Sequence, residues 1–205
     1  MIDKFCNFLV EKIRMQMPDI DDERAEIILY GMQLIIGELP KIFILFAVSF
    51  LLGIGGYMIF AYIALIPYRS SSGGFHLKTH IGCIIGTSIF YYGLIFFSKW
   101  IVLSLLAKCI VALISFIFGI AMVSLYAPAD TENVPIISKK ERKRKKILSY
   151  ITLTLTLLVG ILIPDTVMSN ILIFGVTLQT AMITKPAYIL TNNKYGYANY
   201  KESLN

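Results

Sequence analysis

The chain alternates six long apolar segments with short polar ones. These segments cover residues 27–52, 56–68, 77–97, 101–125, 147–163 and 167–183. A helix needs about 20 apolar residues to cross the hydrocarbon core of a bilayer, where its backbone polar groups satisfy one another. The segment 56–68 is short for this and is expected to be tilted, extended by its neighbours or partly re-entrant. The pattern predicts an all-α, polytopic integral membrane protein with about six transmembrane helices.

The amino-terminal part of the chain is more polar. Residues 1–41 hold eight of the thirteen acidic residues, and residues 1–26 are expected to form an interfacial or cytoplasmic lead-in. Within it, apolar side chains recur near helical spacing at Phe5, Phe8, Leu9 and Ile13. This spacing predicts an amphipathic helix at the membrane surface that ends at Pro18. Asp21 or Asp22 can cap the helix that follows.

The domain organisation follows from where the apolar segments end. We expect residues 1–185 to form a single membrane-embedded domain. Residues 186–205 are rich in Asn, Tyr and Lys and show no apolar period, so they are predicted to be a flexible C-terminal tail.

Composition and charge agree with a membrane environment. Apolar residues make up 57% of the chain, above the roughly 45–50% of soluble domains. The formal charge of +6 comes from Lys139–Lys146, in which seven of eight residues are basic. Beside an apolar span, such a cluster is expected to determine topology and to contact anionic lipid rather than nucleic acid. Three separated cysteines without metal-ligand spacing predict no disulfide framework, metal or cofactor.

The positions of the basic residues also predict an orientation. Cytoplasmic loops of membrane proteins carry an excess of Lys and Arg. With six spans and both termini inside, the cytoplasm receives Lys139–Lys146, Lys185 and the loop that we predict at Arg69–His76. The outer loops then hold only Lys99 and Asp165. Any chemistry of the Arg69–His76 loop is therefore expected on the cytoplasmic side of the plasma membrane.

One polar cluster is hard to explain as lipid-facing sequence. Gly73 and Gly74 precede the third apolar segment, which then carries His76, His80 and Cys83. Ionisable groups at membrane depth are costly and indicate a functional site by default. A thiol beside a base, in the positive field of a helix amino terminus, can act as a nucleophile. The plainer interpretation is a packing cysteine, wetted histidines and a glycine turn.

The order of these residues points to a family. The pattern Arg69-x3-Gly73-Gly74-x-His76-x6-Cys83 resembles the central motif of the accessory gene regulator B family. Further matching regions are Tyr30-Gly31 with Glu38, residues 126–131, and the basic run behind them. The resemblance implies a membrane cysteine endopeptidase of Gram-positive bacteria that processes a quorum-sensing propeptide, and a homodimer.

The resemblance also assigns roles to residues. It makes Cys83 the nucleophile, His76 its general base, and Arg69 and Gln33 supporting polar residues. Gly73 and Gly74 belong to the same motif. The substrate would be a precursor with an amphipathic amino-terminal helix, cleaved to give an acyl-enzyme thioester. A thiol or hydroxyl of the peptide then captures the acyl group as a thiolactone or lactone.

Some alternatives stay open from the sequence. On a straight helix, residues seven apart are separated by about 10.5 Å along the axis, so His76 reaches Cys83 only if the chain before Cys83 is bent. His80 is the nearer base on local grounds. Glu38 could orient the site or lie at the interface, and Asp130 could assist catalysis or form a turn. The alternative functions are a small peptide transporter or a non-catalytic adaptor.

Overall fold

The structure of this protein is a computed structural model that describes residues 2–17, 20–77, 79–132 and 135–198. For residues 2–4, 23, 27, 30, 33–35 and 80 it describes the backbone alone. This part of the chain is all-α, as predicted, and contains eight helices. It divides into two compact units, Met1–Leu51 and Leu52–Asn205, and the single membrane-embedded domain stays a prediction.

The first unit consists of two helices. Helix α1 (Ile2–Gln16) packs against α2 (Asp22–Leu51). Cys6 is buried in α1, whereas Phe8 is more than half exposed. The carboxylate of Asp21 accepts a hydrogen bond of 2.8 Å from the N–H of Arg24, which confirms Asp21 as the cap of α2. That α1 lies at a membrane surface stays a prediction.

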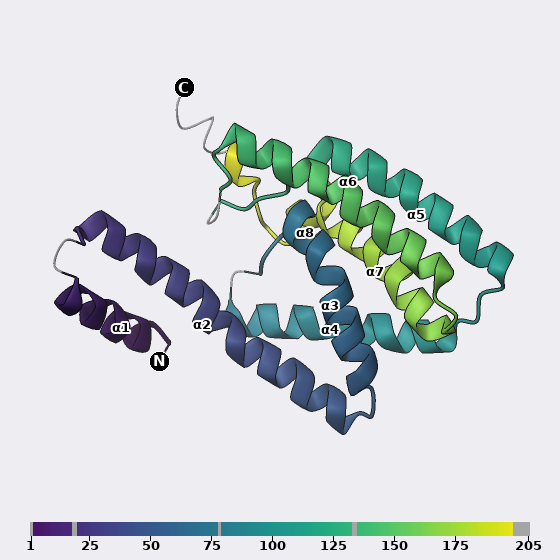
Figure 1. Cartoon of the computed structure of the whole chain (residues 1–205), viewed down its shortest axis with the longest axis horizontal. Coiled ribbons are helices and arrows are strands. Elements are labelled where there is room, and N and C mark those ends of the chain that lie inside the picture. The colour runs from purple at the N-terminus through teal and green to yellow at the C-terminus, as the bar shows by residue number, and fades with distance from the viewer. Residues whose placement is uncertain (1, 18–19, 78, 133–134, 199–205) are drawn as a thin grey trace. The chain divides into compact units, whose positions relative to one another are not determined.

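Among the described residues, the second unit contains six helices, one of which is central. They are α3 (Gly55–Ser72), α4 (His80–Trp100), α5 (Leu105–Tyr126), α6 (Lys139–Leu162), α7 (Thr166–Met182) and α8 (Lys185–Leu190). Helix α7 contacts each of α3, α4, α5 and α6, and α5 lies beside α6 (Figure 1). A polar residue on α7 can therefore reach several other segments.

Small residues and hydroxyl pairs let α7 pack closely. A side chain at Gly175 would meet Leu65 of α3, so the glycine allows the two helices to approach. The hydroxyls of Thr180 on α7 and Tyr68 on α3 lie 2.7 Å apart, and both residues are buried. These contacts fix the carboxyl-terminal end of α7 against the end of α3.

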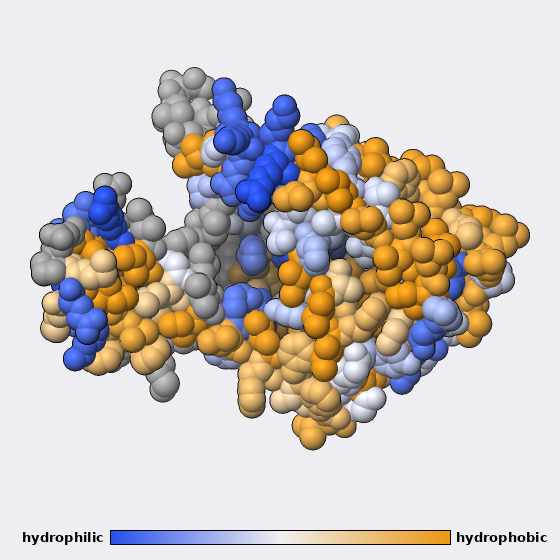
Figure 2. Space-filling view, in the orientation of Figure 1, coloured by the Kyte–Doolittle hydropathy of each residue, from blue (hydrophilic) through white to orange (hydrophobic). Residues whose placement is uncertain are grey.

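Three of these helices are long and apolar enough to cross a membrane. Among the described residues, they cover Ile81–Trp100, Leu105–Tyr126 and Lys139–Leu162. Helix α7 is apolar but shorter. Hydrophobic residues cover much of α5 and α6, and hydrophilic residues gather over the amino-terminal end of α6 (Figure 2). Each predicted apolar segment overlaps one of α2 to α7, and the six-span arrangement stays a prediction.

Two predicted boundaries are wrong. The loop expected at Arg69–His76 begins only at Gly73, because α3 continues through Ser72. The basic run Lys139–Lys146 forms the first two turns of α6 instead of preceding the helix. Ser138 caps this helix by accepting a hydrogen bond from the N–H of Glu141 at 3.4 Å.

The segment after α7 carries packed side chains, and the flexible tail expected at residues 186–205 stays a prediction. Within residues 186–198, predicted to be flexible, α8 is followed by packed aromatic residues. Tyr188 is only 1% exposed, and its ring stacks on that of Tyr195 at 4.1 Å. Tyr195 in turn stacks on Tyr126 at the end of α5. Aromatic rings bury much area per residue, so a few of them can hold a segment that lacks an apolar period.

Candidate active site

A short linker joins α3 to α4 and carries most of the predicted motif. It starts at Gly73 and Gly74, whose φ angles of 79° and 135° favour glycine. A side chain at Gly73 would collide with the main-chain carbonyl of Ala129. At Gly74 its Cβ would lie 2.7 Å from the guanidinium of Arg69. Backbone conformation favours glycine at both positions, and the close approach of the Ala129 backbone also requires it at Gly73.

The linker pairs with the segment that follows α5. The N–H of Gly74 donates to the carbonyl of Ala129, and the N–H of Ala129 donates to the carbonyl of Ser72, both at 2.8 Å. This forms a parallel bridge between Gly73 and Ala129. The bridge holds the start of the linker against a second loop at the same end of the unit.

Two polar side chains fix the linker from the other side. Arg69 donates to the carbonyl of Phe75 at 3.0 Å and to the side-chain oxygen of Gln179 at 3.1 Å. Gln179 donates to the carbonyl of Gly73 at 2.8 Å and to the hydroxyl of Ser72 at 3.2 Å. Gln179 is 2% exposed, so these bonds are shielded from water. Arg69 thus holds the linker backbone, and its supporting role in a reaction stays a prediction.

The far end of the linker lies along α4. A Cβ at Gly82 or Gly86 would approach within 4 Å of Leu77, so this linker residue packs over the first two turns of the helix. Thr79 is the N-cap, and its hydroxyl accepts from the N–H of Gly82 at 3.0 Å. Its carbonyl accepts from the N–H of Cys83 at 2.9 Å. The linker therefore ends by positioning the turn that carries Cys83.

The two residues of the predicted dyad occupy different local structures. His76 is exposed and lies in the non-helical part of the linker, whereas Cys83 is half-buried in the first turn of α4. The axial separation expected on a straight helix therefore does not apply to this pair. His80 begins α4, and its side chain lies outside the described residues.

The other two predicted supporting residues belong to the first unit. Glu38 forms an ion pair with Lys41 on the next turn of α2. Gln33 is also on α2, and its side chain lies outside the described residues. The structure brings together Arg69, Gly73 and Gly74, and Gln179 is their partner in the core, whereas the supporting role of Gln33 stays a prediction. Gln179 could have been noticed in the sequence as a polar residue in an apolar segment.

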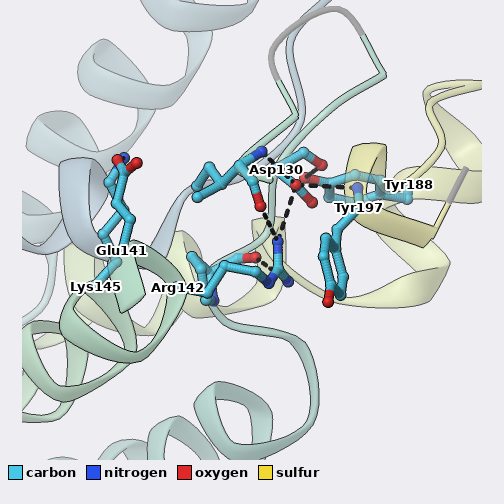
Figure 3. Close-up of polar contacts among 8 residues, drawn as sticks. Asp130, Glu141, Arg142, Lys145, Tyr188 and Tyr197 are labelled. Carbon is cyan, nitrogen blue, oxygen red and sulfur yellow. Dashed lines mark hydrogen bonds and ion pairs between the residues drawn. The ribbon is translucent and has the colours of Figure 1, made fainter. Parts of the chain in front are cut away.

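Asp130, the next residue after the bridge, is a structural anchor. Its side chain is 1% exposed, and Oδ2 accepts from Arg142 at 2.9 Å and from the N–H groups of Ile136 and Tyr197 (Figure 3). The hydroxyl of Tyr188 donates to its main-chain carbonyl at 3.0 Å. Of the two roles left open by the sequence, this environment favours the structural one, because three donors already hold one carboxylate oxygen.

The tyrosines around this anchor are kept neutral. Burial raises the pKa of Tyr188, and the neighbouring Tyr195 and Asp130 raise it further, while Arg69 partly opposes them. Burial also raises the pKa of Tyr195, with a smaller contribution from Tyr126. The phenol of Tyr188 therefore remains a hydrogen-bond donor to Asp130 across the neutral pH range.

Among the described residues, no group of three or more His, Cys, Asp or Glu side chains is placed to bind an ion. The three cysteines are free thiols, with Cys6 buried, Cys83 half-buried and Cys109 exposed. The linker and its two flanking helices carry an imidazole at His76, a thiol at Cys83 and a guanidinium at Arg69.

Comparisons with known proteins agree on one family. The sequence model of AgrB, accessory gene regulator B, matches residues 2–183. An AgrB-like protein of Clostridium perfringens strain SM101 is 34% identical over 79% of this chain and 77% of its own length. A second AgrB-like protein, from C. perfringens strain 13, is 30% identical over 97% and 99%. One from Listeria welshimeri is 26% identical over 97% and 95%. No solved structure matches the chain.

Proposed function

Because this chain belongs to the accessory gene regulator B family, we propose that it is a membrane-embedded cysteine endopeptidase. It cleaves the C-terminal part of an autoinducing-peptide precursor and cyclises the product, as a step in quorum sensing. The observation that carries this proposal is the clamped, non-helical linker, which bears exposed His76 and leads directly into the turn of Cys83.

The proposed reaction has two acyl transfers. The sulfur of Cys83 attacks a precursor carbonyl as His76 accepts the thiol proton, and the proton then passes to the leaving amine. The C–N bond breaks and a thioester forms. A thiol or hydroxyl within the bound peptide next attacks the thioester, giving a thiolactone or lactone and restoring Cys83. Holding that group close to the thioester favours ring closure over hydrolysis.

In this proposal the remaining motif residues position the base. Arg69, Gly73 and Gly74 set the path of the linker, and the contacts of Arg69 with Phe75 and Gln179 support this role. Gln33 and Glu38 are assigned as supporting residues on the family resemblance alone. The protein is proposed to lie in the plasma membrane of a Gram-positive cell as a homodimer, with its site facing the cytoplasm.

The test uses purified protein in lipid vesicles with a synthetic precursor and mass spectrometry of the products. Cys83→Ala should abolish cleavage, and Cys83→Ser should retain little or none. His76→Ala should lower turnover by about two to four orders of magnitude, whereas His80→Ala should cost much less. Cys6→Ala and Cys109→Ala are matched controls that should keep activity.

Each result bears on one part of the proposal. Full cleavage by Cys83→Ala would end the peptidase hypothesis. The opposite ranking of the two histidines would move the base to His80 and leave the nucleophile in place. Transport of the intact precursor across the vesicle membrane, without cleavage, would favour the alternative of a small peptide transporter.

A further inference from the structure

A pocket of about 450 Å³ lies between the end of α3 and the first half of α6. From α3 it is lined by Pro67, Ser70 and Ser71, which share one helix face. The α6 wall consists of residues 141, 144, 145, 148 and 152, which also recur at helical spacing. Its volume lies within the range of about 300–1,000 Å³ typical of small-molecule sites.

The basic residues that begin α6 have different environments. Arg142 is held by Asp130, and the ammonium of Lys146 donates to the carbonyl of Ser124 at 2.6 Å. Lys145 lies 3.6 Å from the half-exposed carboxylate of Glu141. Together with Arg144 these two line the pocket, which leaves one net positive charge there. In the part of the chain that the structure describes, Arg144 has no ion-pair or hydrogen-bond partner, so its guanidinium is available to a ligand.

The lining changes from cationic to apolar along α6. Arg144 and Lys145 are followed one turn later by Leu148, which faces Pro67 of α3 within the same pocket. Helix α6 is also one of the candidate membrane spans. The pocket therefore lies where a basic helix end passes into a sequence apolar enough for hydrocarbon, which is the depth of lipid headgroups.

The hydroxyls of the pocket offer little to a peptide. Ser71 donates to the carbonyl of Pro67 at 2.8 Å, and Thr152 donates to the carbonyl of Leu148 at 2.7 Å. The two hydroxyls also lie 3.1 Å from each other. An extended peptide would need partners for its own N–H and C=O groups, whereas a lipid needs cations for its phosphate and an apolar wall for its chain.

We propose that this pocket binds one anionic phospholipid, with the phosphate at Arg144 and Lys145 and the start of an acyl chain against Leu148 and Pro67. This goes beyond the proposed peptidase activity and does not depend on it. It also differs from a diffuse attraction of the basic run to the membrane, because only the two cations in the pocket should contribute to the site.

The test compares two variants of equal charge. The full-length protein in detergent is titrated with phosphatidylglycerol or phosphatidylcholine, and bound lipid is counted by native mass spectrometry. In Arg144→Gln/Lys145→Gln, the affinity for phosphatidylglycerol should fall by about 30-fold, because each of the two charges removed contributes about 1 kcal/mol to binding. In Lys139→Gln/Lys140→Gln, where both residues are exposed and outside the pocket, it should change less than about threefold.

A second pair of variants tests the apolar wall. Leu148→Trp should fill the pocket and reduce phosphatidylglycerol binding without changing charge. Ile147→Trp adds the same ring to an exposed neighbour outside the pocket and should have little effect. Circular dichroism checks that each variant is folded.

Three results would overturn the proposal. Equal losses in the two glutamine variants would mean diffuse attraction to the basic run. A loss in Arg144→Gln/Lys145→Gln with none in Leu148→Trp would mean a site for phosphate alone. If Arg144→Gln/Lys145→Gln bound phosphatidylglycerol as the wild type does but bound the synthetic precursor more weakly, the pocket would be assigned to an acidic peptide.

Discussion

The side-chain amide of Gln179 donates a hydrogen bond of 2.8 Å to the main-chain carbonyl of Gly73, which lies 106 positions earlier in the sequence. The same amide accepts from Arg69 and donates to Ser72. Helix α7 contacts α3, α4, α5 and α6. The hydrogen bonds of Gln179 therefore fix the start of the linker relative to this packed core. Gln179 is thus placed to align a linker residue without contacting a substrate.

Gln179→Met keeps the size of the side chain and removes these bonds. Leaving buried polar groups without partners costs about 1–3 kcal/mol, so turnover should fall by about ten- to a hundredfold. Asn170→Leu is the matched control, because Asn170 is a buried amide on α7 that binds the carbonyls of Ser98 and Ile101 at the opposite end of α4. It should lower thermal stability similarly and change turnover little. Equal losses of turnover would contradict a positioning role.

Gly73→Ala should be more damaging than an ordinary glycine substitution. The added Cβ collides with the carbonyl of Ala129 and stands on a φ of 79°, so the bridge must open. Precursor cleavage should be lost while the helices still form, as measured by product yield and circular dichroism. Gly93→Ala, in α4 where an added Cβ has no neighbour within 4 Å, should keep activity and slightly stabilise the helix. An active Gly73→Ala variant would argue against the clamped linker.

Thr79→Ala tests whether the start of α4 must be fixed. Loss of an N-cap costs about 1 kcal/mol, and here it frees the turn that carries Cys83. Ser104→Ala removes the equivalent cap of α5, where the hydroxyl accepts from the N–H of Ala107. We expect both variants to melt at slightly lower temperature and Thr79→Ala alone to lose turnover, by roughly tenfold. A similar loss in Ser104→Ala would point to a general effect of stability.

The buried phenol of Tyr188 predicts a loss of stability at high pH. A pKa raised in the folded state means that folding favours the protonated phenol, so its contribution is complete below the ordinary value of about 10. As pH rises above that value the contribution is progressively lost. Tyr188→Phe also lacks the hydrogen bond to Asp130 and should be less stable at pH 7 by about 1 kcal/mol. Its thermal stability should then decline less than that of the wild type between pH 9 and 11; an identical decline would contradict the assignment.

The orientation can be tested by labelling intact cells with an impermeant thiol reagent. In a variant without Cys6, Cys83 and Cys109, single cysteines at exposed Ser70 and Ser138 should resist labelling, because the positive-inside bias places both in the cytoplasm. A cysteine at Val102, which is 84% exposed between α4 and α5, should be labelled. Labelling of Ser70→Cys but not of Val102→Cys would reverse the orientation.

Local patterns in the sequence were sufficient to predict helices α1 to α7 and to identify the motif. Apolar runs predicted the positions of α2 to α7, because a helix that packs in a core or crosses a membrane needs apolar side chains along its length. The boundaries at Arg69 and Lys139 were wrong for one reason. The helices were expected to cover only the apolar segments. Instead, α3 continues into the polar residues that follow its apolar segment, and α6 begins in the polar residues that precede its own.

The contacts that shape the linker could not be obtained in this way. Ala129 and Gln179 bind the start of the linker from distant parts of the chain. Such long-range contacts depend on how the helices pack and are not visible in the local sequence around each residue. The packed tyrosines after α7 were missed for the same reason. Their spacing has no period, but each ring finds a partner on another segment.

The bridge between Gly73 and Ala129 brings together the two ends of the segment that contains α4 and α5. Before residues 102 and 103, Asn170 of α7 binds the carbonyls of Ser98 and Ile101, and after them Ser115 of α5 lies 2.6 Å from the hydroxyl of Thr177 on α7, so α7 holds the chain on both sides. A cut between these two residues should therefore yield fragments that reassemble. One fragment would supply the thiol and the imidazole, and the other would supply Ala129 and Gln179. Fragment complementation would then allow each half of the protein to be varied separately.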